Sequence, residues 1–305
     1  MRVNDDITGR EILSPKSDYI FRLIFGDNRN IEILRAFLMA ALDIPHDEYD
    51  RIELVDTHLK KESDGDKAGI LDVLLHTKSG MRIDIEIQLF ALKAMAERVA
   101  YYASRLIAGQ MTSGDQYHRI KKVVCIAILD YNLITDSGRY HNRYRLYDAE
   151  SGSLFTDVLE IHTMELRKLP ERGNDNLYNW LRFLRADRKE EFEMIAEKSP
   201  ELKKAYMVLK RLSADEQTRL EYEQREKARM DEWARMAYAT DLGIEKGKTE
   251  GRAEGRAEGR AEGRMEEKID MARKMLARGM AVDVVADLSG LTVDEVGALA
   301  RRDGE

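Results

Sequence analysis

Two short strand-like segments, the second of which alternates strictly between polar and apolar residues, constrain the fold of this chain most strongly. Residues 70–76 read ILDVLLH, residues 82–88 read RIDIEIQ, and Lys78, Ser79 and Gly80 form a turn sequence between them. A period of two is typical of β-strands, because successive side chains point to opposite faces. The pattern therefore predicts a β-hairpin with one apolar face and one face that carries carboxylates.

The length of the hairpin loop sets which residues face each other. A three-residue loop with Gly80 in the left-handed conformation pairs Asp72 with Glu86. A four-residue loop that begins at Thr77 shifts the register by one residue and sends the two acids to opposite faces. The three-residue loop is favoured because only it keeps the apolar residues of both strands on one side. These residues are Leu71, Val73, Leu75, Ile83, Ile85 and Ile87.

The polar face of this hairpin has the residue types of a metal site. Asp72 lies opposite Glu86 in the favoured register, and Asp84 and Gln88 share their face. Carboxylate oxygens are ligands that hard divalent cations prefer, and a divalent cation beside a water is what hydrolysis of phosphodiesters requires. The alternative is a half-exposed hairpin whose polar face only meets water, which is common in antiparallel sheets.

Composition and charge restrict the class of protein. The chain has 305 residues and a net charge of −7, so any contact with nucleic acid must be local. From Arg98 to Arg145, eight cations stand against three anions; this window is either a rim that contacts phosphates or a solvated helix and loop. We expect a cytoplasmic protein without a membrane segment, because we find no apolar run of 18 residues and no signal sequence.

The order of the other elements indicates an α/β fold. Residues 31–42 and 91–112 carry apolar residues at helical spacing, and residues 123–129, which include the single cysteine Cys125, form a continuous apolar run of the buried-strand type. An antiparallel hairpin that leads into a helix and then a buried strand predicts a mixed sheet flanked by helices. From residue 176 onward the pattern is almost entirely helical.

A glycine repeat divides the helical part of the chain. Residues 243–264 carry a glycine at every fourth position, and from Gly247 onward each unit reads Gly-x-x-Glu. Because each glycine costs about 1 kcal/mol in a helix interior, we expect a weakly helical, extendable spacer. Beyond it, Thr292 and Glu295 form a capping box after the turn at Gly290, so two short helices resemble a helix-turn-helix. Acidic Asp294 and Glu295 disfavour direct reading of DNA by this tail, and a helical interaction or oligomerisation module is the better prediction.

Motifs around the hairpin resemble those of the Rpn family, the recombination-promoting nucleases or putative transposases of the PD-(D/E)XK nuclease superfamily. The likeness covers roughly residues 14–130. It rests on the K-x-D-x-x-F-R opening from Lys16 to Arg22, on Leu71-Asp72, on Glu86-x-Gln88 and on the helix and loop from Arg98 to Tyr117. The resemblance implies a bacterial, cytoplasmic, Mg²⁺-dependent DNA endonuclease with a restriction-endonuclease-like mixed sheet.

The resemblance also implies roles for particular residues. Asp72 and Glu86 become ligands of Mg²⁺ or Mn²⁺, and the backbone carbonyl of Ile87 becomes a third. Gln88 stands where the wider superfamily has a lysine. A neutral amide can orient a water by hydrogen bonds but supplies no positive charge, so catalysis would depend strongly on the metal ion.

Three further residues are accessory candidates at this site. Asp18 could reach it from the N-terminal helix, with capping or pairing with Arg22 as the alternative. Asp84 lies on the same face as Glu86, and Gln110 follows in the crossover helix, where it could touch DNA.

These observations predict four parts, which are a nuclease-like core at 1–170, a helical extension at 171–242, the spacer at 243–264 and a small helical tail at 265–305. The predicted function is metal-dependent DNA cleavage in recombination or in mobile-element or phage-related DNA processing. We expect DNA as the partner and a homo-oligomer formed through the helical C-terminal region. The alternative is a catalytically silent module that binds DNA or protein and assembles through its tail.

Overall fold

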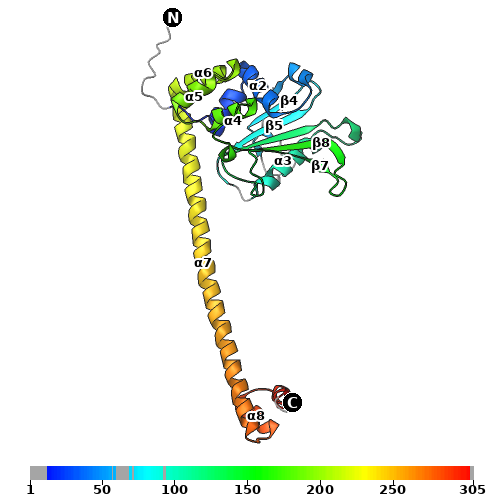
Figure 1. Cartoon of the computed structure of the whole chain (residues 1–305), viewed down its shortest axis with the longest axis vertical. Coiled ribbons are helices and arrows are strands. Elements are labelled where there is room, and N and C mark those ends of the chain that lie inside the picture. Colours follow the sequence, from blue (N-terminus) through cyan, green and yellow to red (C-terminus); the bar gives the residue numbers. More distant parts are fainter. Residues whose placement is uncertain (1–11, 57, 60–68, 71, 92–93, 303–305) are drawn as a thin grey trace. The chain divides into compact units, whose positions relative to one another are not determined.

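The computed structural model describes residues 12–56, 58–59, 69–70, 72–91 and 94–302. The chain divides into two compact units, Met1–Glu226 and Lys227–Glu305. Figure 1 shows the sheet and most of the helices in the first unit. Leu71, one of the predicted apolar residues of the hairpin, lies outside the described residues.

A six-stranded mixed sheet forms the centre of the first unit, and its strand order is β1-β4-β5-β6-β8-β7 (Figure 1). Strands β5, β6 and β8 are parallel to one another, whereas β1, β4 and β7 pair antiparallel with their neighbours. Two short strands, β2 and β3, pair separately. The strands are β1 Glu53–Val55, β2 His58–Leu59, β3 Gly69–Ile70, β4 Val73–His76, β5 Arg82–Gln88, β6 Val123–Leu129, β7 His141–Tyr147 and β8 Leu154–Glu165. The mixed sheet confirms the predicted fold class.

Helices cover both faces of this sheet. Five of them contribute to a large core on one face, to which β5 gives Ile83, Ile85 and Ile87. They are α1 Asp18–Phe25, α2 Ile31–Ala41, α4 Asn176–Arg185, α5 Lys189–Ala196 and α6 Pro200–Ala214. Helix α3, Met95–Ala108, covers the other face and packs on Val123, Cys125, Ala127 and Leu129 of β6. Short 3₁₀ turns lie at Asn28–Asn30, His46–Asp50, Tyr117–Arg119 and Leu166–Lys168.

Alternation along β6 explains why this strand can serve both cores. All seven of its residues are buried, with odd-numbered side chains on the α3 face and even-numbered ones on the opposite face. A continuous apolar run is what a strand covered on both faces requires. Cys125 is 2% exposed within this strand, which confirms the prediction that it is a core residue.

The second unit consists of most of one long helix and a small helical cluster. Helix α7 spans Glu216–Ala277 without a break, so the Gly-x-x-Glu repeat is a continuous helix rather than the weakly helical, extendable spacer that we expected. Arg, Ala and Glu, three of every four residues in the repeat, are strong helix formers, and they maintain the helix despite the glycines.

Two short helices follow α7 and pack on its end. Helices α8, Val282–Ser289, and α9, Val293–Arg302, enclose a core with Ala272, in which Val285 and Val296 are fully buried. Gly290 takes the left-handed conformation between them, with φ 65°. Thr292 and Glu295 exchange the hydrogen bonds of a capping box, as predicted. Among the residues that the structure describes, we find no helix both long enough and apolar enough to cross a membrane.

Candidate metal and nuclease site

The β4–β5 hairpin has the predicted register. Val73 pairs with Ile85 and Leu74 with Asp84, and Gly80 in the turn has φ 87°. This register is the one that a three-residue loop produces. It confirms the prediction for the part of the hairpin that the ladder covers.

The first strand of the hairpin is shorter than predicted. Residues 70–76 do not form one strand, because Ile70 ends β3, which pairs with β2, and β4 begins only at Val73. Asp72 therefore lies in a bend immediately before β4. Freed from the ladder, its Oδ2 accepts a hydrogen bond of 2.8 Å from the backbone N–H of Ile87 on β5.

The acidic side chains of β5 are buried rather than exposed to water. Asp84 is 3% and Glu86 7% exposed, and both line a small space under α3 with Val99 and Tyr102. The alternative of a half-solvated polar face is therefore wrong for these two residues. The physical reason is that α3 packs over this face of the sheet, and periodicity in the strands alone does not reveal that cover.

Helix α3 supplies a cation to this acidic face. Arg98 Nη2 lies 3.4 Å from Glu86 Oε1, and the guanidinium lies 4.8 Å from the centre of the Tyr102 ring. Asp84 Oδ1 is buried and has no hydrogen-bond partner among the residues described. A buried carboxyl oxygen without a partner is costly, so this face can accommodate a further positive charge.

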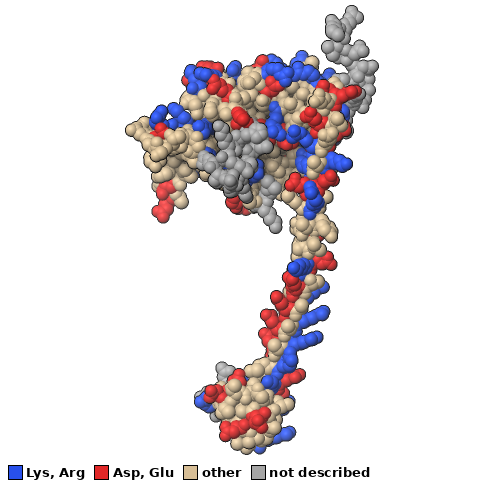
Figure 2. Space-filling model, turned by 180° about the vertical axis from the view of Figure 1, so that it is seen from behind, with Lys and Arg blue, Asp and Glu red and all other residues tan. Residues whose placement is uncertain are grey.

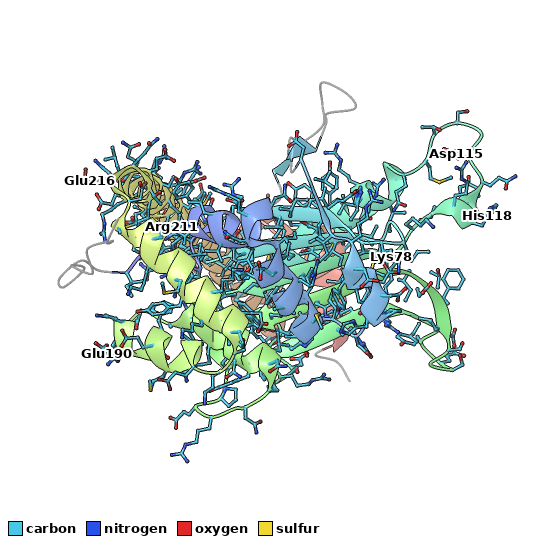
Figure 3. The ribbon with its side chains drawn as sticks, turned by 90° about the horizontal axis from the view of Figure 1, so that it is seen from above. Lys78, Asp115, His118, Glu190, Arg211 and Glu216 are labelled. Atoms are coloured by element: carbon cyan, nitrogen blue, oxygen red, sulfur yellow. The ribbon has the colours of Figure 1, made fainter. Side chains whose placement is uncertain are left out.

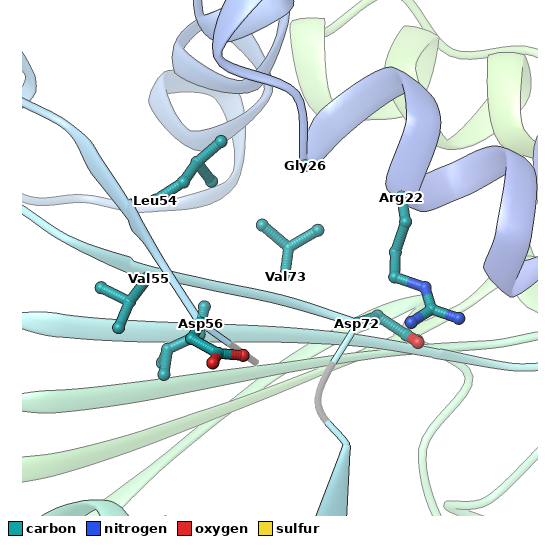
Figure 4. Close-up of a pocket in the computed structure, with 8 residues that line it drawn as sticks. Arg22, Gly26, Leu54, Val55, Asp56, Asp72 and Val73 are labelled. Carbon is teal, nitrogen blue, oxygen red and sulfur yellow. The ribbon is translucent and has the colours of Figure 1, made fainter. Parts of the chain in front are cut away.

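Helix α1 approaches the site from the other side of Asp72. Figure 4 shows Arg22 reaching from α1 toward Asp72 at a pocket of about 250 Å³, which is also lined by Gly26 and Asp56. Arg22 also pairs with Asp18 at 3.6 Å, the pairing that the sequence suggested as the alternative role of Asp18. Both residues act electrostatically on Asp72, so Asp18 lies near the predicted site as well.

Burial and crowding of charge make these carboxyl groups reluctant to ionise. Burial raises the pKa of Asp72 to about 7; the N–H of Ile87 opposes this rise, and the charge of Glu86 adds to it. Burial also raises the pKa of Glu86, against the influence of Arg98. The pKa of Asp84 is raised well above its usual range by burial and by its two acidic neighbours. The cluster needs either protons or a cation to be stable.

The donor set fits a hard divalent cation only in part. Within the described ranges, no group of three or more His, Cys, Asp and Glu side chains is placed to hold a metal ion. Asp72 and Glu86 are two such side chains, and they offer the carboxylate oxygens that Mg²⁺ prefers. Mg²⁺ usually keeps several waters and takes only one or two protein carboxylates. Two carboxylates are therefore enough to bind Mg²⁺, although they do not form a cage built from side chains alone.

Gln88 and Gln110 lie in different parts of the first unit. Gln88 is half-buried at the end of β5, beside Asp130, whose N–H donates to the Gln88 carbonyl. Gln110 instead binds the backbone of Leu106 and Lys121, at distances between 2.8 and 3.3 Å, and so fastens the end of α3 to the loop before β6. Figure 3 shows the tip of this loop, at Asp115 and His118, far from α6. Arg82, the first residue of β5, donates to the same Leu106 carbonyl, so Gln110 lies near the start of β5 and not with Asp72 and Glu86 near its end.

Sequence reasoning missed a second buried charge network, on β8. Glu160 is 1% exposed and accepts hydrogen bonds of 2.7 Å from Lys122 and from Arg145. His162 Nε2 lies 2.8 Å from the other oxygen of Glu160, and His162 Nδ1 lies 2.7 Å from His141 Nε2. The available signal was Glu160 and His162 at alternate positions, next to the apolar residues Leu159 and Ile161 of β8.

The mixed sheet with an acidic hairpin and a crossover helix defines a protein of the PD-(D/E)XK nuclease class. The family model described as PD-(D/E)XK nuclease family transposase matches residues 15–239, more than half of the chain, and the chain belongs to this family. Residues 265–301 match the model described as Rpn/YhgA-like nuclease family, C-terminal HTH domain. Neither a curated protein nor a solved structure matches the chain. The family model extends well beyond residue 130, where the likeness seen in the sequence ended.

The raised pKa of Asp72 predicts how pH and metal affect stability. A carboxyl whose pKa is higher in the folded than in the unfolded state stabilises the protein at low pH, and this contribution is lost as the pH rises through about 7. We expect a cost of about 1–2 kcal/mol at pH 8 after allowance for the partial exposure of Asp72. Mg²⁺ should offset it, so that Mg²⁺ raises the melting temperature more at pH 8 than at pH 6.

Thermal unfolding at both pH values, with Mg²⁺ and with EDTA, measures this effect. Asp72→Asn should remove most of the difference, because an amide does not ionise. Equal Mg²⁺ shifts at the two pH values in the wild type would contradict the assignment of Asp72 as the group that titrates.

Proposed function

We propose that this chain is a divalent-metal-dependent DNA endonuclease that hydrolyses phosphodiester bonds. The observation that carries the proposal is the convergence of two carboxyl groups with raised pKa values, Asp72 and Glu86, where β4 leaves its ladder with β5. Membership of a family described as PD-(D/E)XK nuclease transposases supports it. DNA is the substrate, and Mg²⁺ or Mn²⁺ is the cofactor.

Asp72, Glu86 and the backbone carbonyl of Ile87 would hold the metal. In a β-strand the N–H and the C=O of one residue point to the same edge. The Ile87 N–H points to Asp72, whereas the Arg82 N–H points to the chain before β6, so odd and even residues of β5 serve opposite edges. The ladder with β4 ends at Ile85, which leaves the Ile87 carbonyl beside Asp72 and available as a ligand.

A bound divalent ion supplies an activated water and neutralises charge on the phosphate. The residues of the chain then have distinct tasks. Gln88 orients the attacking water by hydrogen bonds, and Asp84 supports Glu86 from the same strand face. Asp18 acts on Asp72 through Arg22, with which it pairs.

The family description supports a role in DNA recombination or transposition. We propose that the protein acts in the cytoplasm, in recombination or in mobile-element or phage-related DNA processing. The C-terminal HTH domain would assemble the protein or hold it on DNA. Because Asp294 and Glu295 begin the second helix of this domain, we favour assembly over reading of bases.

A nicking assay tests the proposed function. Purified wild type is incubated with supercoiled plasmid, linear duplex or single-stranded DNA in Mg²⁺, Mn²⁺, Ca²⁺ or EDTA. We expect nicking in Mg²⁺ or Mn²⁺ and none in EDTA. DNA binding of equal strength in Mg²⁺ and in EDTA, with no cleavage in any condition, would favour the alternative of a catalytically silent binding module.

We further propose that two copies of the chain pair through α7. Large apolar side chains of this helix are exposed, with Trp233 at 55% and Met230 at 61%. Met230, Ala237 and Ile244 recur every seven residues, and Trp233 lies beside them on the same side of the helix. An isolated helix that exposes such a stripe gains stability by burying it against a second helix.

The charges of α7 favour a parallel arrangement of the two copies. In each Gly-x-x-Glu unit a basic residue, Lys248 or an Arg, and Glu are two residues apart, about 200° around a helix. Figure 2 shows the basic and the acidic residues along opposite sides of this helix. Where these residues flank the contact, a two-fold axis parallel to the helices sets the basic side of one copy beside the acidic side of the other, whereas antiparallel pairing opposes like charges. Because a four-residue repeat drifts about 40° per unit around the helix, this holds for only part of the repeat.

Trp233→Glu tests this pairing. We expect it to raise the dissociation constant of the dimer by about 100-fold, because it puts a charge in place of a large apolar side chain. Leu242→Glu is the matched control, since Leu242 is equally exposed, at 54%, but lies on the opposite side of α7. Light scattering coupled to size exclusion measures both variants. A monomeric wild type, or an equal effect of the two substitutions, would contradict the proposed face.

A further inference from the structure

Asp72, Glu86 and Gln88 supply none of the positive charge that hydrolysis of a phosphodiester uses beyond the metal. As water attacks, negative charge develops on the phosphate oxygens, and a cationic donor aimed at them lowers the barrier. Gln88 is neutral and cannot supply that charge. A cation from elsewhere in the fold must therefore do so if the site is to stabilise the transition state with more than the metal alone.

Arg98 occupies a suitable place for this task. It lies on α3, directly over the acidic face of β5, and its only contact with an acid in the structure described is the long one of 3.4 Å to Glu86. Charge-assisted hydrogen bonds are usually shorter, about 2.7–2.9 Å. The Arg98 Nε is buried and has no hydrogen-bond partner within the described residues. Most of the donors of this guanidinium are thus unused.

Packing holds the Arg98 guanidinium in position without occupying its hydrogen-bond donors. Its place 4.8 Å from the centre of the Tyr102 ring fixes its plane by a cation–π contact, and the Tyr102 side chain itself is buried. The Arg98 side chain is 36% exposed, so a ligand can reach it from solvent. A fixed, partly exposed guanidinium with free donors matches the geometry of a phosphate, which it can bind through two parallel hydrogen bonds.

We propose that Arg98 is a catalytic residue that binds a non-bridging oxygen of the scissile phosphate and supplies the charge that Gln88 lacks. This role rests on the proposed nuclease function. In the reaction the water oxygen bonds to phosphorus, and the bond from phosphorus to the leaving oxygen breaks. The water loses one proton to solvent and the leaving oxygen gains one from solvent. Arg98 donates hydrogen bonds throughout and keeps its protons.

Glu86 would have two partners in succession. Without metal it faces Arg98; a divalent ion bound to Glu86 would take the place of this contact and leave the guanidinium to the phosphate. Because Arg98 competes with the metal for Glu86, its removal should strengthen metal binding while it weakens catalysis. These opposite changes distinguish a catalytic role from a structural one, since a residue that only positions Glu86 would lower both when lost.

Arg98→Met and Arg98→Lys test the proposal, with Arg105→Met as the matched control. Arg105 lies two turns along the same helix with its guanidinium 6.0 Å from the centre of another tyrosine ring, Tyr101, so its removal reports general effects on α3. The affinity for Mg²⁺ is measured by calorimetry without DNA, and the cleavage rate at saturating Mg²⁺. We expect Arg98→Met to cleave about 100-fold more slowly and to bind Mg²⁺ more tightly, and Arg98→Lys to recover part of the rate.

Each outcome decides the proposal. Cleavage by Arg98→Met at the wild-type rate, or a loss of both rate and Mg²⁺ affinity, would overturn the role of Arg98 while leaving the nuclease function intact. A wild type that cleaves no DNA would overturn the nuclease function and this role with it. Should Arg98→Met not fold, Arg98→Lys, which retains the charge and the aliphatic stem, decides by the same two measurements.

Discussion

Asp72→Asn is expected to slow metal-dependent DNA cleavage by about 1000-fold or more, and Glu86→Gln to do the same. Each substitution removes a carboxylate charge that would hold the divalent ion, and several kcal/mol of charge stabilisation are lost with the ion. Both variants keep an oxygen that can accept the hydrogen bond of the native side chain, from Ile87 N–H for residue 72 and from Arg98 for residue 86. The fold should therefore persist, and nicking of supercoiled plasmid measures the effect.

Glu53→Gln is the matched control for these two variants. Glu53 lies on β1 in the same sheet, is exposed and pairs with Arg51 at the surface, so its loss should leave cleavage unchanged. Circular dichroism melts of all three variants show whether they fold. If Asp72→Asn and Glu86→Gln both retain metal-dependent nicking, the hairpin is not the site.

Glu160→Ala is expected to lower the free energy of unfolding by about 3–5 kcal/mol. Glu160 is a buried residue of β8, the strand between β6 and β7. Its loss leaves Lys122, Arg145 and His162 without their shared acceptor. An uncompensated charge in a buried network costs more than the contact itself contributed. Urea unfolding, followed by circular dichroism at pH 7, measures the change.

The network around Glu160 also predicts that the stability of the protein falls at low pH. Burial opposes ionisation of Glu160, but hydrogen bonds from His162, Lys122 and Arg145 outweigh it and hold the pKa of this carboxyl far below its usual range. Its contribution is therefore present above the unfolded pKa of about 4.3 and is lost as the pH falls further. The wild type should lose more stability than Glu160→Ala between pH 5 and pH 3. Glu150→Ala, an exposed acid in the loop between β7 and β8, should change neither quantity; equal acid sensitivity of wild type and Glu160→Ala would contradict the account of the network.

The register of the hairpin was predictable from sequence because the loop residues and the positions of the apolar residues indicate the same strand pairing. Only an odd loop with Gly80 in the left-handed conformation puts the isoleucines of β5 on the same side as Val73 and Leu75 of β4, and that register is observed. The break before Val73 was not predictable, since residues 70–76 contain no glycine or proline that would interrupt a strand. It arises because Ile70 pairs with β2, a contact between segments whose pairing the sequence pattern does not specify.

The surroundings of the site were harder to predict for a related reason. An amphipathic pattern shows that α3 must bury one side, but it does not show which face of the sheet receives it. Arg98 consequently looked like one cation among eight in a basic window, and its place over Glu86 follows only from the packing. Glu160 and Arg145 likewise meet because β7 and β8 pair. The glycines of the repeat also suggested a weakly helical segment, whereas α7 is continuous because the residues between the glycines are strong helix formers.

The most direct test of the central claim is the rate at which wild type and Glu86→Gln nick supercoiled plasmid at saturating Mg²⁺ and in EDTA. We predict that only the wild type in Mg²⁺ nicks the plasmid. Equal rates for the two proteins in Mg²⁺, or undiminished nicking by the wild type in EDTA, would contradict a metal-dependent nuclease site at Asp72 and Glu86.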